Sequence, residues 1–272
     1  METLQIGATT KKVPSTWNEL RRRQLLDLLP VLYSATGPDR RLRLLSVLTG
    51  FRLPLLVGLP VDVLAQLLPL VDFLESDDHL LTAQLLPQLR VPGRHRTEPA
   101  TAWHGPAAHL SNVTFGEFMF ADTFFVQYAL HQRPVHLDMF LAVLYRPGKR
   151  NPNPEAADWN GDVRLPFNEH QLEVRTQRIA HVPDLEKLAV LTWYRGCRTQ
   201  LADEFPDVFA EADRDEQGPK KAPQWDRVLR QLSGGAFGTV QETATQPLRL
   251  LLAEMQDAAV DYHRLKAQKP GF

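Results

Sequence analysis

The stretch TFGEFMFADTFFVQYALHQRPVHLDMFLAVLYRP, residues 114–147, decides the fold. In its first half Phe120, Phe124 and Tyr128 are four residues apart, the spacing of one helix face. Phe115, Phe118 and Phe125 form a second row, and a helix that is apolar on two sides is expected at the centre of a core. Thr114-Phe115-Gly116-Glu117 has the pattern of a capping box and predicts where this helix begins. Asp122, an acid among phenylalanines, is expected on its narrow polar face.

Helical spacing continues on both sides of this stretch. Leu137, Phe140, Leu141, Leu144 and Tyr145 predict a second helix that ends at Arg146-Pro147-Gly148. Capping residues, prolines and glycines mark the ends of the others. Further helices are expected over about 16–36, over 40–49 with Gly50 as the stop, and over about 60–74, 168–179, 184–198 and 224–232. Pro247 opens a last long helix, whose apolar repeat continues to Tyr262.

Strand patterns are confined to the N-terminus. Thr3 to Val13 alternates in part and is rich in threonine, which predicts a short strand or hairpin that Pro14 ends. Thr16-Trp17-Asn18-Glu19 is a second candidate capping box. The sequence therefore predicts a mainly α fold, a multi-helix orthogonal bundle with a small N-terminal β element.

A segment rich in Pro, Gly, His and Thr suggests a boundary between two parts of the chain. Residues 1–92 are expected to hold the N-terminal strands and leucine-rich helices, 93–109 a surface loop, and 110–272 a helical domain, although the parts can also form one continuous unit. The main core is expected in the last of these, with the following residues in it: Phe118, Phe125, Phe140, Leu141, Leu188 and Leu191.

Composition excludes several classes of protein. The 272 residues carry 31 basic and 32 acidic side chains, a net charge of −1, which argues against a broadly basic nucleic-acid binder. Cys197 is the single cysteine, so no intrachain disulfide or cysteine-only zinc site can form. The most apolar stretch, residues 52–74, is interrupted by Asp62 and Asp72, so it has no uncharged run of the roughly 18 residues needed to span a bilayer. No signal peptide pattern is present, and a cytoplasmic location is expected.

The sequence contains no recognisable catalytic pattern. It has no His-Glu-x-x-His helix and no Gly-x-Ser-x-Gly elbow. Ser233 to Gly238 is glycine-rich but lacks the preceding strand and the following Lys-Ser/Thr of a phosphate loop. We therefore expect a non-enzymatic protein without a cofactor. The alternative is an enzyme whose site is assembled from residues far apart in the sequence.

A second alternative is a calcium-dependent module. Asp158, Asn160 and Asp162 stand at positions 1, 3 and 5 of a calcium-loop pattern, and Glu169 stands at position 12. Val163 occupies the position that needs glycine for the sharp turn, so a plain turn without a metal is preferred. Both interpretations remain open from the sequence.

The triplet Arg21-Arg22-Arg23 lies in the first turn of a predicted helix, which is the unfavourable end for positive charge. These side chains are therefore expected to face solvent or a partner. The leucine-rich helices that follow offer more apolar faces than one core can cover, and surplus apolar surface is typical of a protein-interaction site. We expect an acidic protein partner, steered by Arg21, Arg22 and Arg23.

Three segments carry a family resemblance: residues 13–20 (VPSTWNEL), residues 114–118 (TFGEF), and residues 137–147 with their Leu-Tyr-Arg-Pro ending. Together they resemble uncharacterised proteins of tailed-phage and prophage structural clusters in Bacteroidetes-type bacteria, some of which are similar to tail assembly chaperones. The resemblance implies a role in virion tail assembly, with a tape-measure or tail-tube protein as partner and no nucleic acid or membrane. None of these motifs is catalytic, so no active-site residue is implied.

Overall fold

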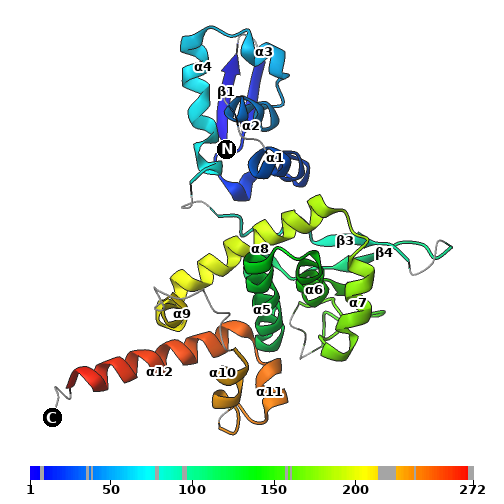
Figure 1. Ribbon diagram of the computed structural model, residues 1–272, viewed down its shortest axis with the longest axis vertical. Coiled ribbons are helices and arrows are strands. Elements are labelled where there is room, and N and C mark those ends of the chain that lie inside the picture. The colour runs from blue at the N-terminus through cyan, green and yellow to red at the C-terminus, as the bar shows by residue number, and fades with distance from the viewer. Residues whose placement is uncertain are drawn as a thin grey trace. The chain divides into compact units, whose positions relative to one another are not determined.

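The computed structural model describes residues 1–6, 9–34, 37, 39–76, 80–93, 97–156, 159, 161–213, 225–235 and 237–268. The fold is mainly α with a small hairpin at the N-terminus, as predicted (Figure 1). The chain divides into two compact units. Unit 1 comprises Met1–Leu86 and Pro183–Cys197, and unit 2 comprises Pro87–Val182 and Arg198–Phe272.

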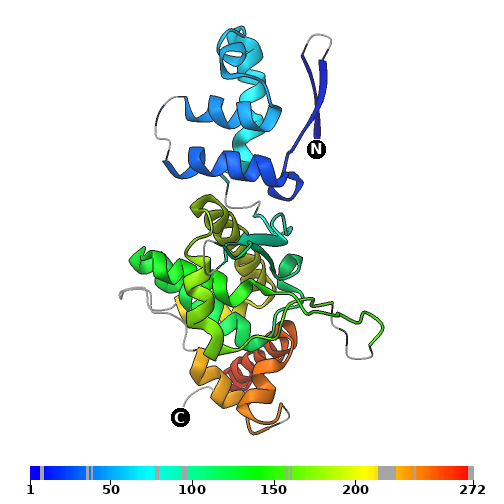
Figure 2. The same ribbon diagram turned by 90° about the vertical axis from the view of Figure 1, so that its right-hand side faces the viewer.

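Unit 1 combines the hairpin with short helices. Strands β1 (Glu2–Ile6) and β2 (Thr9–Val13) pair antiparallel, with Leu4 opposite Lys11. The hairpin lies at one side of the helices of the unit, where β2 contacts α2 (Figure 2). These helices are η1 (Trp17–Glu19), α1 (Arg22–Ser34), α2 (Arg40–Thr49), α3 (Leu53–Val57), α4 (Val61–Leu67), η2 (Leu68–Leu74) and the first part of α8 (Asp184–Glu204).

The core of unit 1 is built from leucines at helical spacing. Leu25, Leu28 and Leu29 of α1 are fully buried, and Leu44, Leu45 and Leu48 of α2 are buried opposite them. The indole Nε1 of Trp17 donates to the backbone oxygen of Phe73 at 2.9 Å, so even the polar atom of this buried ring is satisfied.

Unit 2 contains a short sheet and the remaining helices. Strands β3 (Gln88–Val91), β4 (Thr101–His104) and β5 (Arg146–Pro147) pair antiparallel in that order. The helices are η3 (Ala108–Leu110), α5 (Phe115–His131), α6 (Pro134–Leu144), η4 (Glu169–Gln171), α7 (Leu172–Ile179), the rest of α8, α9 (Pro206–Asp213), α10 (Trp225–Leu232), α11 (Val240–Thr245) and α12 (Leu248–Gln268).

The aromatic stretch forms the centre of unit 2, where α5 packs along α6. Thr114 and Glu117 make the predicted capping box, with both reciprocal hydrogen bonds present. Phe118 and Phe140 are fully buried, as predicted. The Phe118 ring meets Trp225 of α10 edge-on with centroids 5.3 Å apart, a geometry that adds to simple burial.

Several expectations were wrong. Thr16 makes no capping hydrogen bond, and α1 begins only at Arg22. Strands are not confined to the N-terminus, because β4 lies inside the expected 93–109 loop and buries Trp103. Asp122 is fully buried rather than on a polar face. Its carboxylate accepts from Arg198 Nε at 2.6 Å and from Trp225 Nε1 at 2.9 Å.

The two units also differ from the expected division into residues 1–92 and 110–272. One reason is that α8 contacts the N-terminal part of the chain. The Trp193 indole of α8 donates a hydrogen bond to the backbone oxygen of Thr82 at 3.0 Å. Most of α8 therefore belongs with unit 1. Leu188 and Leu191 were expected in the core of the part after residue 110. They lie instead in the part of α8 that belongs to unit 1, and they are only half-buried. Phe125 is also half-buried.

Candidate functional site

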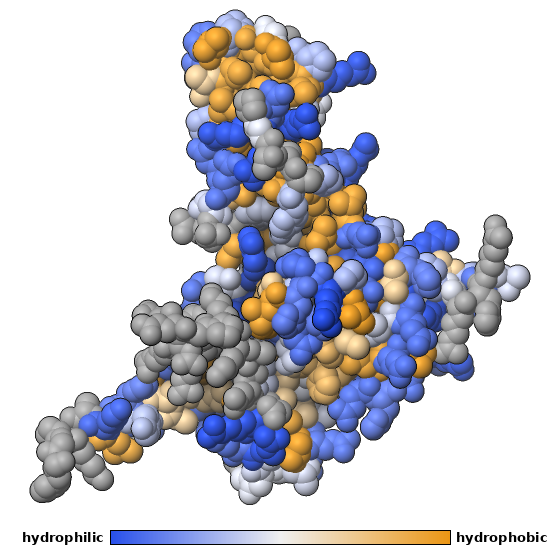
Figure 3. Space-filling model, viewed as in Figure 1, coloured by the Kyte–Doolittle hydropathy of each residue, from blue (hydrophilic) through white to orange (hydrophobic). Residues whose placement is uncertain are grey.

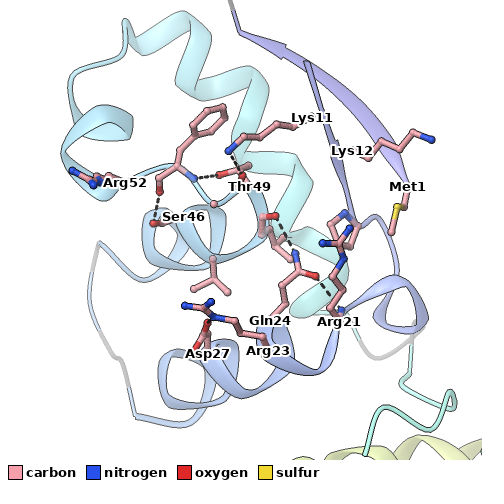
Figure 4. A pocket seen from close by; sticks show the side chains of 15 residues that line it. Met1, Lys11, Lys12, Arg21, Arg23, Gln24, Asp27, Ser46, Thr49 and Arg52 are labelled. Atoms are coloured by element: carbon pink, nitrogen blue, oxygen red, sulfur yellow. Dashed lines mark hydrogen bonds and ion pairs between the residues drawn. The ribbon is translucent and has the colours of Figure 1, made fainter. Parts of the chain in front are cut away.

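Unit 1 contains a pocket of about 650 Å³ (Figure 4). Three segments that are separate in the sequence line it: the end of the hairpin, the start of α1, and the turn that joins α2 to α3. The volume lies in the range that accepts a small ligand or a few side chains of a partner. The lining residues are Met1, Lys11, Lys12, Pro14, Arg21, Arg23, Gln24, Asp27, Ser46, Val47, Leu48, Thr49, Gly50, Phe51 and Arg52.

The α2–α3 turn is shaped by Gly50, which ends α2 in the left-handed conformation with φ of 67°. A side chain is strained at such a φ, so glycine suits this position. Ser46 Oγ donates to the backbone oxygen of Phe51 at 2.6 Å, and the Phe51 N–H donates to Thr49 Oγ1 at 3.2 Å. These bonds hold the turn against the end of α2. Arg52, which follows the turn, is exposed.

Lys11 connects the hairpin to this turn. Its Nζ donates to the backbone oxygen of Thr49 at 2.9 Å and lies 4.1 Å from the centre of the Phe51 ring. On the other side, Gln24 Nε2 donates to the backbone oxygen of Leu48 at 3.2 Å. The free carbonyls at the C-terminus of α2 are thus satisfied by side chains of β2 and α1, which fixes the three segments around the pocket.

The pocket is strongly basic. Five cationic side chains line it, from Lys11, Lys12, Arg21, Arg23 and Arg52, against one carboxylate. That carboxylate belongs to Asp27, whose Oδ2 is 3.7 Å from Arg23 Nε in a largely exposed pair. Exposed pairs of this kind are weak, so Arg23 remains available to a ligand. The whole chain has a net charge of −1, and the pocket is therefore a local concentration of positive charge.

The predicted arginine triplet divides between two roles. Arg21 and Arg23 line the pocket, whereas Arg22 donates from Nη2 to Glu186 Oε1 of α8 at 2.6 Å. Sequence reasoning did not find Lys11, Lys12 or Arg52. The Lys11-Lys12 pair at the end of a predicted strand was the available signal, but only the folded hairpin brings it to the arginines.

An exposed apolar surface begins one turn beyond the pocket. The Leu55 N–H donates to the backbone oxygen of Arg52 at 3.0 Å, so the first turn of α3 connects the two features. Leu55, Val57 and Val61 are 47%, 63% and 84% exposed. Figure 3 shows hydrophobic surface over the end of unit 1 that carries α3 and α4. Large apolar side chains clustered at a surface are typical of a binding face.

Unit 2 holds a second charged cluster, which is buried. Glu117 of α5 pairs with the guanidinium groups of Arg146 and Arg164, and Arg164 Nε also donates to Asp162 Oδ1 at 2.8 Å. The two arginine side chains have no exposed surface, and Glu117 is 2% exposed. The Arg164 guanidinium also donates to the backbone oxygens of Leu144 and Asn112.

Burial and ion pairing act in opposite directions on the pKa values of the two arginines. Burial lowers the pKa of Arg146 to about 10, although Glu117 opposes the change. Burial also acts against the charged form of Arg164, but Glu117 and Asp162 outweigh it and raise the pKa of Arg164. Both carboxylates are therefore occupied by arginine, and we interpret the cluster as a structural link between α5 and the residues around β5.

The calcium alternative receives no support from the residues that can be described. Asp158 and Asn160 lie outside the described residues. The Asp162 carboxylate is paired with the Arg164 guanidinium, which takes the place of a metal cation on it. Glu169 begins η4 and is exposed. Among the described residues, no group of three or more His, Cys, Asp and Glu side chains is arranged to hold a metal ion.

Comparison of the chain with family models, curated proteins and solved structures found no match. Within the described ranges, none of the helices has both the length and the apolar character needed to cross a membrane. Among the described residues, the basic pocket of unit 1 is the feature whose shape and charge best suit a binding site.

Proposed function

We propose that this protein is a non-enzymatic interaction protein that binds an acidic, amphipathic segment of a partner through the basic pocket of unit 1. The observation that carries the proposal is the set of five cationic side chains around a pocket of about 650 Å³ with a single carboxylate. Carboxylates of a partner would pair with four cationic residues that are all exposed: Lys12, Arg21, Arg23 and Arg52.

The neighbouring apolar surface favours a protein segment over a nucleic acid. A helix with acidic and apolar faces would place its acidic side chains in the pocket and its apolar side chains on Leu55, Val57 and Val61. Single-stranded nucleic acids are held by exposed aromatic rings that stack on bases. Phe51 is the one aromatic among the described lining residues, and Lys11 lies over its ring.

The resemblance to phage and prophage structural-cluster proteins gives this binding its proposed setting in tail assembly. A tape-measure protein, which is long and helical, is a partner of the required chemistry, and a tail-tube protein is the other candidate. In this setting the chain holds an aggregation-prone or unassembled segment until it is incorporated, as a tail assembly chaperone does. The arginines would raise the association rate more than the final affinity.

The test is co-expression with the tape-measure protein and with the tail-tube protein of a phage from such a cluster, followed by affinity capture of the wild-type chain. Arg21→Glu with Arg23→Glu should abolish recovery of the partner. Arg43→Glu is the matched control, because Arg43 is an exposed arginine of α2 outside the pocket. Recovery of neither tail protein, or equal recovery with the double variant, would refute the proposal.

A further inference from the structure

The turn that joins α5 to α6 places two histidine side chains next to each other. His131 is the last residue of α5, and His136 lies in the first turn of α6. Two residues at this spacing could not share a face of one continuous helix, but here a turn between two helices separates them. The centres of the two imidazole rings are 6.0 Å apart, and the ring planes are inclined by 59°.

The turn is short and is fixed by hydrogen bonds. Gln132 ends α5 in the left-handed conformation, with φ of 52°, and its N–H donates to the backbone oxygen of Tyr128 at 2.8 Å. Pro134 then opens α6, and the His136 N–H donates to the backbone oxygen of Arg133 at 3.0 Å. Because both histidines stand on these ordered helix ends, little conformational entropy is lost when the two rings bind one ligand.

The separation of the rings fits a single transition-metal ion. Two imidazoles on a tetrahedral zinc ion, with zinc–nitrogen distances of about 2.1 Å, have their ring centres about 5–6 Å apart. Among the described residues, His136 Nδ1 is also a buried nitrogen without a hydrogen-bond partner, and a bound ion is one of the established reasons for such an atom. The charge of Arg133 opposes a cation, but Arg133 is exposed, so solvent weakens its effect.

We infer that His131 and His136 together bind one zinc ion at the α5–α6 turn. Imidazole nitrogen is a preferred ligand of zinc, copper and nickel, whereas calcium and magnesium prefer oxygen ligands. The two histidines fill two of the four positions of a tetrahedral ion, and water or a donor atom from another molecule takes the other two. The site lies in unit 2 and does not depend on the function proposed for the pocket of unit 1.

Isothermal titration calorimetry of the full chain, prepared without a histidine tag and titrated with Zn²⁺ alone, tests the inference. One ion should bind with a dissociation constant of roughly 1–200 µM, since half of the ligands of a structural zinc site are present. His131→Ala and His136→Ala should each weaken this binding by at least about tenfold. His181→Ala is the matched control and should leave it unchanged, because His181 is an exposed histidine just after α7.

Electron paramagnetic resonance with Cu²⁺ in place of Zn²⁺ reports the ligands themselves. The spectrum should show splitting from two imidazole nitrogens in the wild-type chain and from one in His131→Ala. His131 is exposed, so its truncation should leave the fold intact, and the test does not depend on His136→Ala alone. Equal zinc affinity of His131→Ala and the wild type, or a wild-type dissociation constant above about 1 mM, would overturn the inference.

Discussion

Glu117→Gln is expected to destabilise unit 2 severely. Glu117 is 2% exposed and pairs with Arg146 and Arg164, whose side chains have no exposed surface. The glutamine has nearly the same shape and can still accept the hydrogen bond from the Thr114 N–H that completes the capping box. The substitution therefore removes the negative charge while it preserves the cap and the packing.

The magnitude follows from what remains in the cluster. Among the described residues, Asp162 is then the one carboxylate that still pairs with the two buried guanidinium groups. Removing one partner of a buried ionic contact costs about 3–5 kcal/mol, because the other charge stays buried without compensation. For a unit of this size, each kcal/mol lowers the melting temperature by roughly 2–4 °C, so a decrease of about 10 °C is expected.

Urea unfolding followed by far-UV circular dichroism measures the loss, and hydrogen exchange of the α5 amides assigns it to unit 2. Glu173→Gln is the matched control, since Glu173 is exposed on α7 and its loss should cost less than about 0.5 kcal/mol. A loss below about 1 kcal/mol for Glu117→Gln, or unchanged exchange in α5, would refute the view that this cluster holds unit 2 together.

Three further predictions concern packing and pH. Phe140→Ala should reduce the free energy of unfolding by about 3–5 kcal/mol in urea titration, as for other buried aromatic residues; a cost below about 1 kcal/mol would contradict its central place. Gly196→Ala should lower the melting temperature even though alanine favours helices, because the new Cβ would lie 2.1 Å from the backbone oxygen of Leu81; a higher melting temperature would show that this close approach is wrong. The N-terminal ammonium and the Ser15 N–H lower the pKa of Glu19 from 4.5 to about 2. Between about pH 2 and 4.5, Glu19 is protonated in the unfolded chain but ionised in the folded protein. The stability that the ionised Glu19 contributes is therefore present above about pH 4.5 and is lost as the pH falls toward 2. A carboxyl NMR titration with its midpoint near 4.5 would contradict it.

The helices could be predicted where local spacing and capping agreed. Gly50 ends α2 and Thr114 caps α5 as the sequence predicted. The same capping pattern at Thr16 was misleading, because the Glu19 carboxylate is occupied by the N-terminal ammonium and by Ser15. A local pattern could not reveal this competition, since one of the partners lies 18 residues away.

Long-range contacts explain most of the remaining differences. Asp122 was expected on a polar face, but Arg198 and Trp225, which are 76 and 103 residues away, give it a buried ion pair and a hydrogen bond. Strand β4 was hidden in a segment whose composition is typical of a loop, and its pairing with β3 and β5 makes it a strand.

The candidate site could be predicted only in part, because it too depends on contacts between segments that are far apart in the sequence. Arg21 and Arg23 were visible as a basic run in one predicted helix. Lys11, Lys12 and Arg52 join them only through the register of the hairpin and the turn after α2. A cluster assembled from three segments has no signature in any one of them.

The central claim, that the basic pocket binds an acidic helical segment, is tested most directly by titrating the full chain into a fluorescein-labelled amphipathic peptide rich in glutamate and leucine. Fluorescence anisotropy should show binding that Arg21→Glu with Arg23→Glu weakens by at least about tenfold, while Arg43→Glu leaves it unchanged. Raising the salt from about 0.1 M to 1 M, which shortens the screening length from roughly 10 Å to 3 Å, should weaken it as well. Equal affinity for the wild type and the double variant, or tighter binding of a single-stranded DNA of the same charge, would contradict the account.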